Sequence, residues 1–140
     1  MPSKPRSHLA APKPLDEKVS VNLGYVDLGQ IDLLVRDGFY GNRTDFIRTA
    51  IRNQLARHAD AVQQSVSRQM LVLGIYHFSA ADLQAVRDAG QTLQIRVLGL
   101  ATIGSEVEPA LALAAIESVV VLGALHASPA VRAALAGRIR

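Results

Sequence analysis

Cysteine is absent from this sequence of 140 residues. Without thiols the chain has no disulfide framework and no thiolate metal site, which fits the reducing cytoplasm in which we expect it to act. None of the four histidines is paired at the helical spacing that would place two metal ligands on one face. They are His8, His58, His77 and His126. The sequence therefore predicts neither a metal nor a cofactor.

Long apolar runs and export signals are also missing. The most apolar stretch, Ala110–Val131, contains Glu117, His126 and Pro129. Its charge-free part is shorter than the roughly 20 residues that a membrane-spanning helix needs. The segment Met1–Arg6 is polar and proline-rich, unlike a secretory signal. We expect neither a membrane protein nor an exported one.

Motifs that carry catalysis are lacking too. The sequence holds no Gly-x-Ser-x-Gly nucleophile turn and no Gly-x-x-x-x-Gly-Lys phosphate loop, and its acidic residues are scattered. We therefore expect that the protein is not an enzyme.

Charge is distributed unevenly along the chain. Residues 1–58 hold nine Lys and Arg against six Asp and Glu, whereas residues 59–140 hold six of each, so the net charge of +3 belongs to the first part. A basic part suits a polyanionic partner. Residues 1–16 contain four prolines and no apolar periodicity, which predicts a flexible basic arm that either contacts phosphates or is only a solvated tail.

A short strand and two helices are predicted after this arm. Polar and apolar residues alternate over Lys18–Leu23, as in a half-buried strand. A first helix is expected over Leu28–Asp37, with Asp27 as its N-cap and Gly38 ending it. Its apolar stripe is formed by Leu28, Ile31, Leu34 and Val35.

The second helix is predicted to begin after a turn at Gly41, because Asn42 and Asp45 have the spacing of a capping pair. Its apolar stripe is Phe46, Ile47, Ala50, Ile51 and Leu55, and its other surface carries Arg43, Arg48, Arg52 and Arg57. Since no Gly or Pro occurs before Gly74, we expect this helix to continue toward Ser67.

One strand with two helices exposes too much apolar surface to be stable alone. Two copies of Lys18–Leu23 paired antiparallel would turn the valines inward and project Lys18, Ser20 and Asn22 outward. A two-stranded ribbon of this width fits the major groove of DNA.

This order of elements, and above all the segment Gly38–Arg52, resembles the ribbon-helix-helix family of DNA-binding proteins. The resemblance covers Lys18–His58 and implies that Lys18, Ser20 and Asn22 contact base edges. It further implies that phosphate is contacted by the second-helix entry, which consists of Gly41, Asn42, Arg43 and Thr44. The alternatives are a solvent-facing strand and simple helix capping.

The remainder of the chain contains an internal repeat. Val-Leu-Gly occurs at Val72, Val97 and Val121, each time at the end of a β-rich run and before an Ala- and Leu-rich helical piece. Copies of one strand and one helix must stack into a short parallel sheet. His77, Thr102 and His126 then share one repeat position, but the two histidines are too far apart for one ion, so we do not expect nickel sensing.

The predicted fold is α+β. An obligately dimeric ribbon-helix-helix domain over residues 17–68 precedes a three-repeat α/β solenoid-like oligomerisation domain over residues 69–140. The predicted function is a sequence-specific regulator, a repressor that binds double-stranded DNA as a homodimer, tetramer or higher oligomer associated with the nucleoid. The alternatives are an antitoxin whose C-terminal domain binds a partner protein, a DNA-organising filament protein, and a small-molecule sensor.

Overall fold

The computed structural model describes residues 15–140 of the chain. Within this range it has six helices and three strands, and it divides into two compact units, one up to Ala50 and one over residues 51–140. The predicted basic arm lies outside the described residues except for Leu15 and Asp16.

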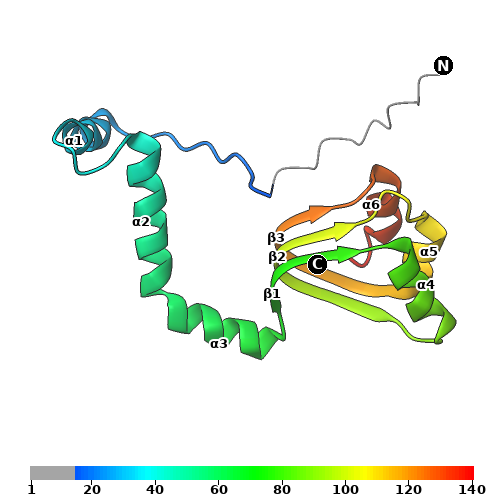
Figure 1. Cartoon of the computed structure of the whole chain (residues 1–140). Helices are drawn as coiled ribbons and strands as arrows, with labels where there is room; N and C mark the ends of the chain where they lie inside the picture. The colour runs from blue at the N-terminus through cyan, green and yellow to red at the C-terminus, as the bar shows by residue number, and fades with distance from the viewer. Residues whose placement is uncertain (1–14) are drawn as a thin grey trace, which may run out of the picture. The chain divides into compact units, whose positions relative to one another are not determined.

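The first unit begins with an extended segment, and helix α1 spans Tyr25–Arg36 (Figure 1). The predicted strand over Lys18–Leu23 does not form in the single chain, because a strand needs a hydrogen-bonded neighbour and the described residues offer none. The expected start of α1 was also wrong, since Gly24 is its N-cap and Asp27 lies in its first turn. Gly38 follows the helix with φ of 84°, as expected for a residue that ends a helix.

Helix α2 spans Arg43–Arg57, and its start agrees with the predicted capping pair. The expected continuation toward Ser67 was wrong in one respect. The helix ends at Arg57, where the His58 N–H donates to the Leu55 carbonyl, and α3 begins separately at Ala59 and ends at Gln69. Neither Gly nor Pro marks this break, so propensity alone could not predict it.

The second unit contains a parallel sheet in the order β1-β2-β3, as predicted (Figure 1). Strand β1 is Val72–Phe78, β2 is Leu93–Ile103 and β3 is Ile116–His126. Each strand is followed by a helix: α4 over Ala80–Asp88, α5 over Pro109–Ala115 and α6 over Pro129–Leu135. The register aligns Val72 with Val97 and Val97 with Val121.

The core of this unit lies on one face of the sheet. Alternate residues of β2 point into it, and Leu83 of α4, Leu111 of α5 and Leu135 of α6 pack against them. The β2 members of this core are Ile95, Val97, Ala101 and Ile103. All three repeat helices therefore cover the same face.

Glycines form a row across the sheet, because Gly74 pairs with Gly99 and Gly99 with Gly123. All three have positive φ, at 138°, 139° and 117°, a region that other residues rarely adopt. A Cβ on Gly99 would lie 2.2 Å from the Gly74 carbonyl oxygen. The strands thus approach each other at points where no side chain fits.

The start of α4 is held by two carboxylates whose pKa values are lowered. Asp82 accepts from the Ser79 N–H at 2.9 Å and completes a capping box, while Glu106 accepts from the Ala80 N–H at 3.1 Å. Hydrogen bonds from Ser79 lower the pKa of Asp82, and those from the Glu106 backbone N–H and then the Ala80 N–H lower the pKa of Glu106, because they favour the charged carboxylates.

We expect carboxyl titrations followed by NMR to place both midpoints below the ordinary values, about 3.9 for Asp and about 4.3 for Glu. Because the folded pKa is the lower one, the stability that these groups contribute is present above those values and is lost as the pH falls through the folded pKa. Ser79→Ala removes the hydroxyl but keeps the backbone N–H that donates to Asp82, so it should raise the Asp82 midpoint only part of the way toward normal and leave that of Glu106 unchanged. Equal shifts in both residues would contradict this assignment.

Candidate nucleic-acid interface

The extended segment Lys18–Leu23 exposes both sets of its alternating side chains. Lys18, Ser20 and Asn22 are exposed, and so are Val19 at 78% and Val21 at 71%. Two neighbouring valines left in water indicate a surface that the single chain does not cover.

The first unit as a whole has almost no core. Ile31 is the one buried hydrophobic residue between positions 15 and 50, and Tyr40 packs edge-on against Phe46 with ring centroids 5.0 Å apart. Large apolar side chains on this segment stay exposed, among them Val26, Leu33, Phe39 and Ile47. A segment with so small a core leaves much apolar surface that another element or another chain could bury.

The second-helix entry uses part of its hydrogen-bonding capacity for capping. The Asp45 N–H donates to Asn42 Oδ1 at 2.8 Å, and the Gly41 N–H donates to Asp45 Oδ2 at 2.9 Å. The first-turn N–H groups of Arg43 and Thr44 have no carbonyl of the helix to bond. A phosphate at this helix start would therefore be bound by Arg43 and Thr44 rather than by Gly41, whose N–H already faces a carboxylate.

Arg43 also joins the two helices of this unit. Its Nε and Nη2 donate to the two carboxylate oxygens of Asp32 in α1, each at 2.8 Å. The hydrogen bond from Arg43 holds the pKa of Asp32 below its usual value, and the pKa of Arg43 is raised in turn. Since a guanidinium has five N–H donors, three remain for a phosphate.

Sequence reasoning did not identify Asp32. It lies 11 residues before Arg43, across the turn between the helices, and no local spacing rule joins two residues at that separation. Asp32 orients Arg43 at the helix entry. The exposed Arg48 and Arg52 extend the basic surface of α2.

No group of three His, Asp or Glu side chains between positions 15 and 140 is placed to hold a metal ion. No described helix has the length and apolar character required to cross a membrane.

Comparison with known proteins places these features in a family. Neither the curated proteins nor the solved structures include a match to the chain. The Ribbon-Helix-Helix transcriptional regulator family, in contrast, matches residues 14–132. This range includes the extended segment, both helices of the first unit and all three strands. Because the match covers well over half of the chain, the protein belongs to the ribbon-helix-helix family of DNA-binding transcriptional regulators.

Proposed function

We propose that the protein is a sequence-specific repressor that acts as a homodimer on an operator. The Lys18–Leu23 segments of two chains pair antiparallel and enter the major groove as a ribbon. Lys18, Ser20 and Asn22 contact base edges, and the entry of α2, formed by Gly41, Asn42, Arg43 and Thr44, binds phosphate through Arg43 and Thr44. Residues 17–68 form the dimeric DNA-binding domain in this proposal.

Pairing geometry restricts the register of such a ribbon. Residues directly opposite each other in an antiparallel pair point to the same face. An axis midway between two consecutive residues would set residues of opposite faces against each other. The two-fold axis must therefore set one residue opposite its own copy in the partner. An axis at Ser20 places Lys18 opposite Asn22 of the partner and Val19 opposite Val21. All three polar side chains then lie on one face and the valines on the other.

The chemistry of the three residues suits base reading. The Asn22 amide can form two hydrogen bonds with adenine, the Lys18 ammonium can donate to guanine, and the Ser20 hydroxyl can donate or accept. The observation that carries the proposal is the exposure of Val19 and Val21 in a chain of this family. These valines become buried when a second copy supplies the other half of the ribbon.

Selection of binding sites from random DNA tests this function. The wild-type protein should enrich a two-fold symmetric sequence. Asn22→Ala removes the two hydrogen bonds to adenine, so it should weaken binding to that sequence by about 1–3 kcal/mol for each half-site. The preference at the adenine position should relax, while weak binding to random DNA persists.

Arg48→Ala is the matched control, because it removes a charge from α2 outside the ribbon. It should weaken binding to all DNA sequences alike, because it removes one salt-dependent contact with phosphate. A wild-type protein that enriches no sequence would refute the repressor proposal.

The second unit, in our proposal, joins ribbon dimers into tetramers or larger assemblies. Two dimers held together would occupy neighbouring half-sites cooperatively, because binding of the first dimer raises the local concentration of the second. The truncation of the chain after Ser67 should then retain the sequence preference and lose the cooperativity.

A further inference from the structure

The three-stranded sheet has a second face that the repeat helices do not cover. Since alternate residues of β2 point into the core, Leu98 and Leu100 point to the opposite side. The register places Leu73 and Leu122 beside Leu98, and Ile75 and Ala124 beside Leu100. We call this surface the open face: Leu73, Ile75, Leu98, Leu100, Leu122 and Ala124.

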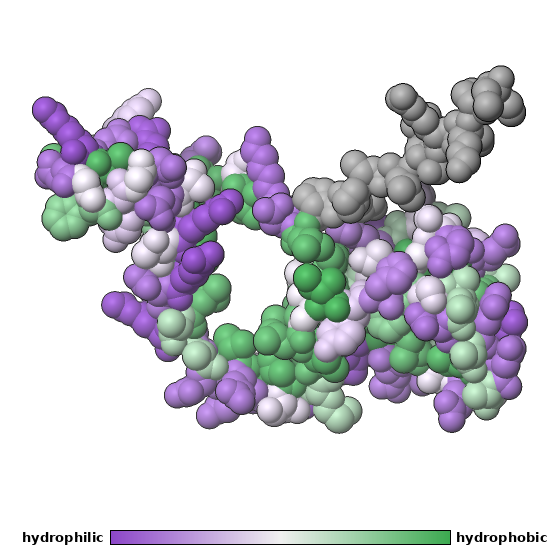
Figure 2. Space-filling model, viewed as in Figure 1, coloured by the Kyte–Doolittle hydropathy of each residue, from purple (hydrophilic) through white to green (hydrophobic). Residues whose placement is uncertain are grey.

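Much of the open face is in contact with water. Leu73 is 66% exposed, Ile75 61% and Leu122 51%, whereas Leu98 and Ala124 are half-buried and Leu100, on the central strand, is buried. Parallel sheets occur almost only where both faces are buried, so a parallel sheet with one bare apolar face is incomplete. Figure 2 shows hydrophobic residues gathered where α3 leads into the sheet.

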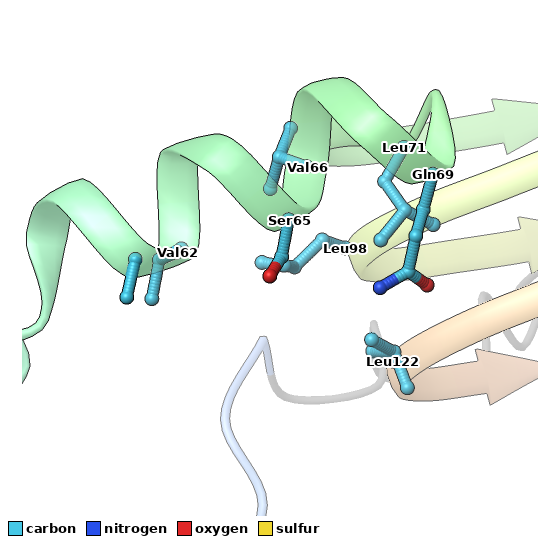
Figure 3. A pocket seen from close by; sticks show the side chains of 8 residues that line it. Val62, Ser65, Val66, Gln69, Leu71, Leu98 and Leu122 are labelled. Carbon is cyan, nitrogen blue, oxygen red and sulfur yellow. The ribbon is translucent and has the colours of Figure 1, made fainter.

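Helix α3 covers only part of this surface. It borders a groove of about 250 Å³ that is lined by Val62 and Val66 of the helix and by Leu98 and Leu122 of the sheet (Figure 3). No residue of β1 lines this groove. Leu73 and Ile75 therefore stay exposed.

The chemistry of the open face favours a partner with the same surface. None of its six residues is charged, so the apolar centre of this face holds no charges that two copies would repel. The next row on the same face is polar and consists of His77, Thr102 and His126. The neighbouring Arg96 is already engaged, because its Nε donates to the Gln69 carbonyl at 2.8 Å.

The distribution of side-chain size also suits two copies. The β1 edge carries the large residues Leu73 and Ile75, whereas β3 carries the small Ala124 beside Leu122. A two-fold axis parallel to the strands places β1 of one copy over β3 of the other, so that Ile75 meets the partner's Ala124.

We propose that the open face binds the open face of a second copy, sheet against sheet, and that this contact joins two ribbon dimers. The inference rests on the proposed function only in naming ribbon dimers as the units that are joined. It assigns the contact to six residues, and these can be altered without touching the ribbon.

Ile75→Glu in the full chain tests the contact. It places a charge at a symmetric apolar interface and should raise the dissociation constant of the tetramer at least about 100-fold, so the mass in solution falls from tetramer to dimer. The dimer should keep its preference for the selected DNA sequence. Leu113→Glu is the matched control, because Leu113 is also exposed, at 40%, but lies on α5 in the layer that covers the other face.

A mass for Ile75→Glu equal to that of the wild type, with an unchanged circular dichroism spectrum, would overturn the inference while leaving the repressor proposal intact. If instead the mass halves but the wild type selects no DNA sequence, the repressor proposal fails and the sheet contact stands. The two failures are therefore distinguishable.

A pair of cysteine substitutions tests the contact between the two sheets if Ile75→Glu does not fold. Positions 75 and 124 of one chain lie two strand spacings apart, roughly 10 Å, too far for a disulfide within the chain. Because the natural chain has no cysteine, oxidation of Ile75→Cys/Ala124→Cys should give covalently linked chains only through the proposed contact. Linked chains support it, and a product that stays monomeric under denaturing conditions overturns it.

Discussion

Replacing Gly99 with alanine is expected to lower the free energy of unfolding of the second unit by about 3 kcal/mol or more. The new Cβ would lie 2.2 Å from the Gly74 carbonyl oxygen, a separation that atoms cannot adopt. β1 and β2 would have to move apart where they are hydrogen-bonded, and alanine would in addition be strained at φ of 139°. Urea unfolding followed by circular dichroism measures the loss.

Gly74→Ala separates the two causes. Gly74 has nearly the same φ, at 138°, but no strand precedes β1 in the sheet, and the nearest atom to its Cβ would be a Tyr76 ring carbon at 3.4 Å. Gly74→Ala should lower the free energy of unfolding only by the cost of the strained backbone, about 1–3 kcal/mol. Equal losses for Gly74→Ala and Gly99→Ala would show that close approach of the strands is not what requires glycine at position 99.

Val21→Asp is expected to abolish both dimer formation by the ribbon and specific DNA binding. In the proposed ribbon Val21 lies on the buried face, so aspartate would place an uncompensated charge there, at a cost of about 3–5 kcal/mol for each chain. The dissociation constant of the ribbon dimer should rise by more than about 100-fold. Analytical ultracentrifugation measures the mass, and fluorescence anisotropy measures the binding to the selected sequence.

Asn22→Asp is the matched control for this result. It introduces the same carboxylate one position later, on the outward face and opposite Lys18 of the partner. It should therefore keep the dimer and lose only DNA binding, by repulsion from phosphates. If Val21→Asp kept the dimer, the inward orientation of the valines would be wrong.

The second unit shows how far sequence alone could lead. The Val-Leu-Gly repeats predicted the parallel strands, since each repeat carries one strand signal and one helical signal and the copies can only stack. The same signals do not reveal which face the helices cover, because β2 is apolar on both faces. Its open-face residues Leu98 and Leu100 are as apolar as its core residues Ile95 and Val97.

In the first unit, local signals predicted the capping pair of α2 correctly, because Asn42 and Asp45 interact within one turn. They failed at the start of α1. Tyr25 and Val26 are exposed, so they do not continue the apolar stripe, although both belong to the helix. The Asp32–Arg43 pair was missed because it depends on how two helices meet, which no single-helix pattern encodes.

The strand over Lys18–Leu23 is a different case. Its alternation is clear in the sequence, yet the single chain leaves it extended and unpaired, since the neighbour that completes it in our proposal belongs to another copy. Exposure of Val19 and Val21 is what the structure adds. The alternation in the sequence predicts an apolar face, and the exposure of the two valines shows that this face is uncovered.

Disulfide linking at position 20 tests the two-chain ribbon most directly. Ser20 lies on the proposed two-fold axis, where opposed Cβ atoms are about 4.5–5.5 Å apart, so a disulfide needs the strands to approach by only about 1 Å, and the chain has no other cysteine. Ser20→Cys should be oxidised rapidly to a covalent dimer, whereas Asp88→Cys, exposed on α4, should not. Equal, slow linking of both variants would contradict the ribbon on which the account depends.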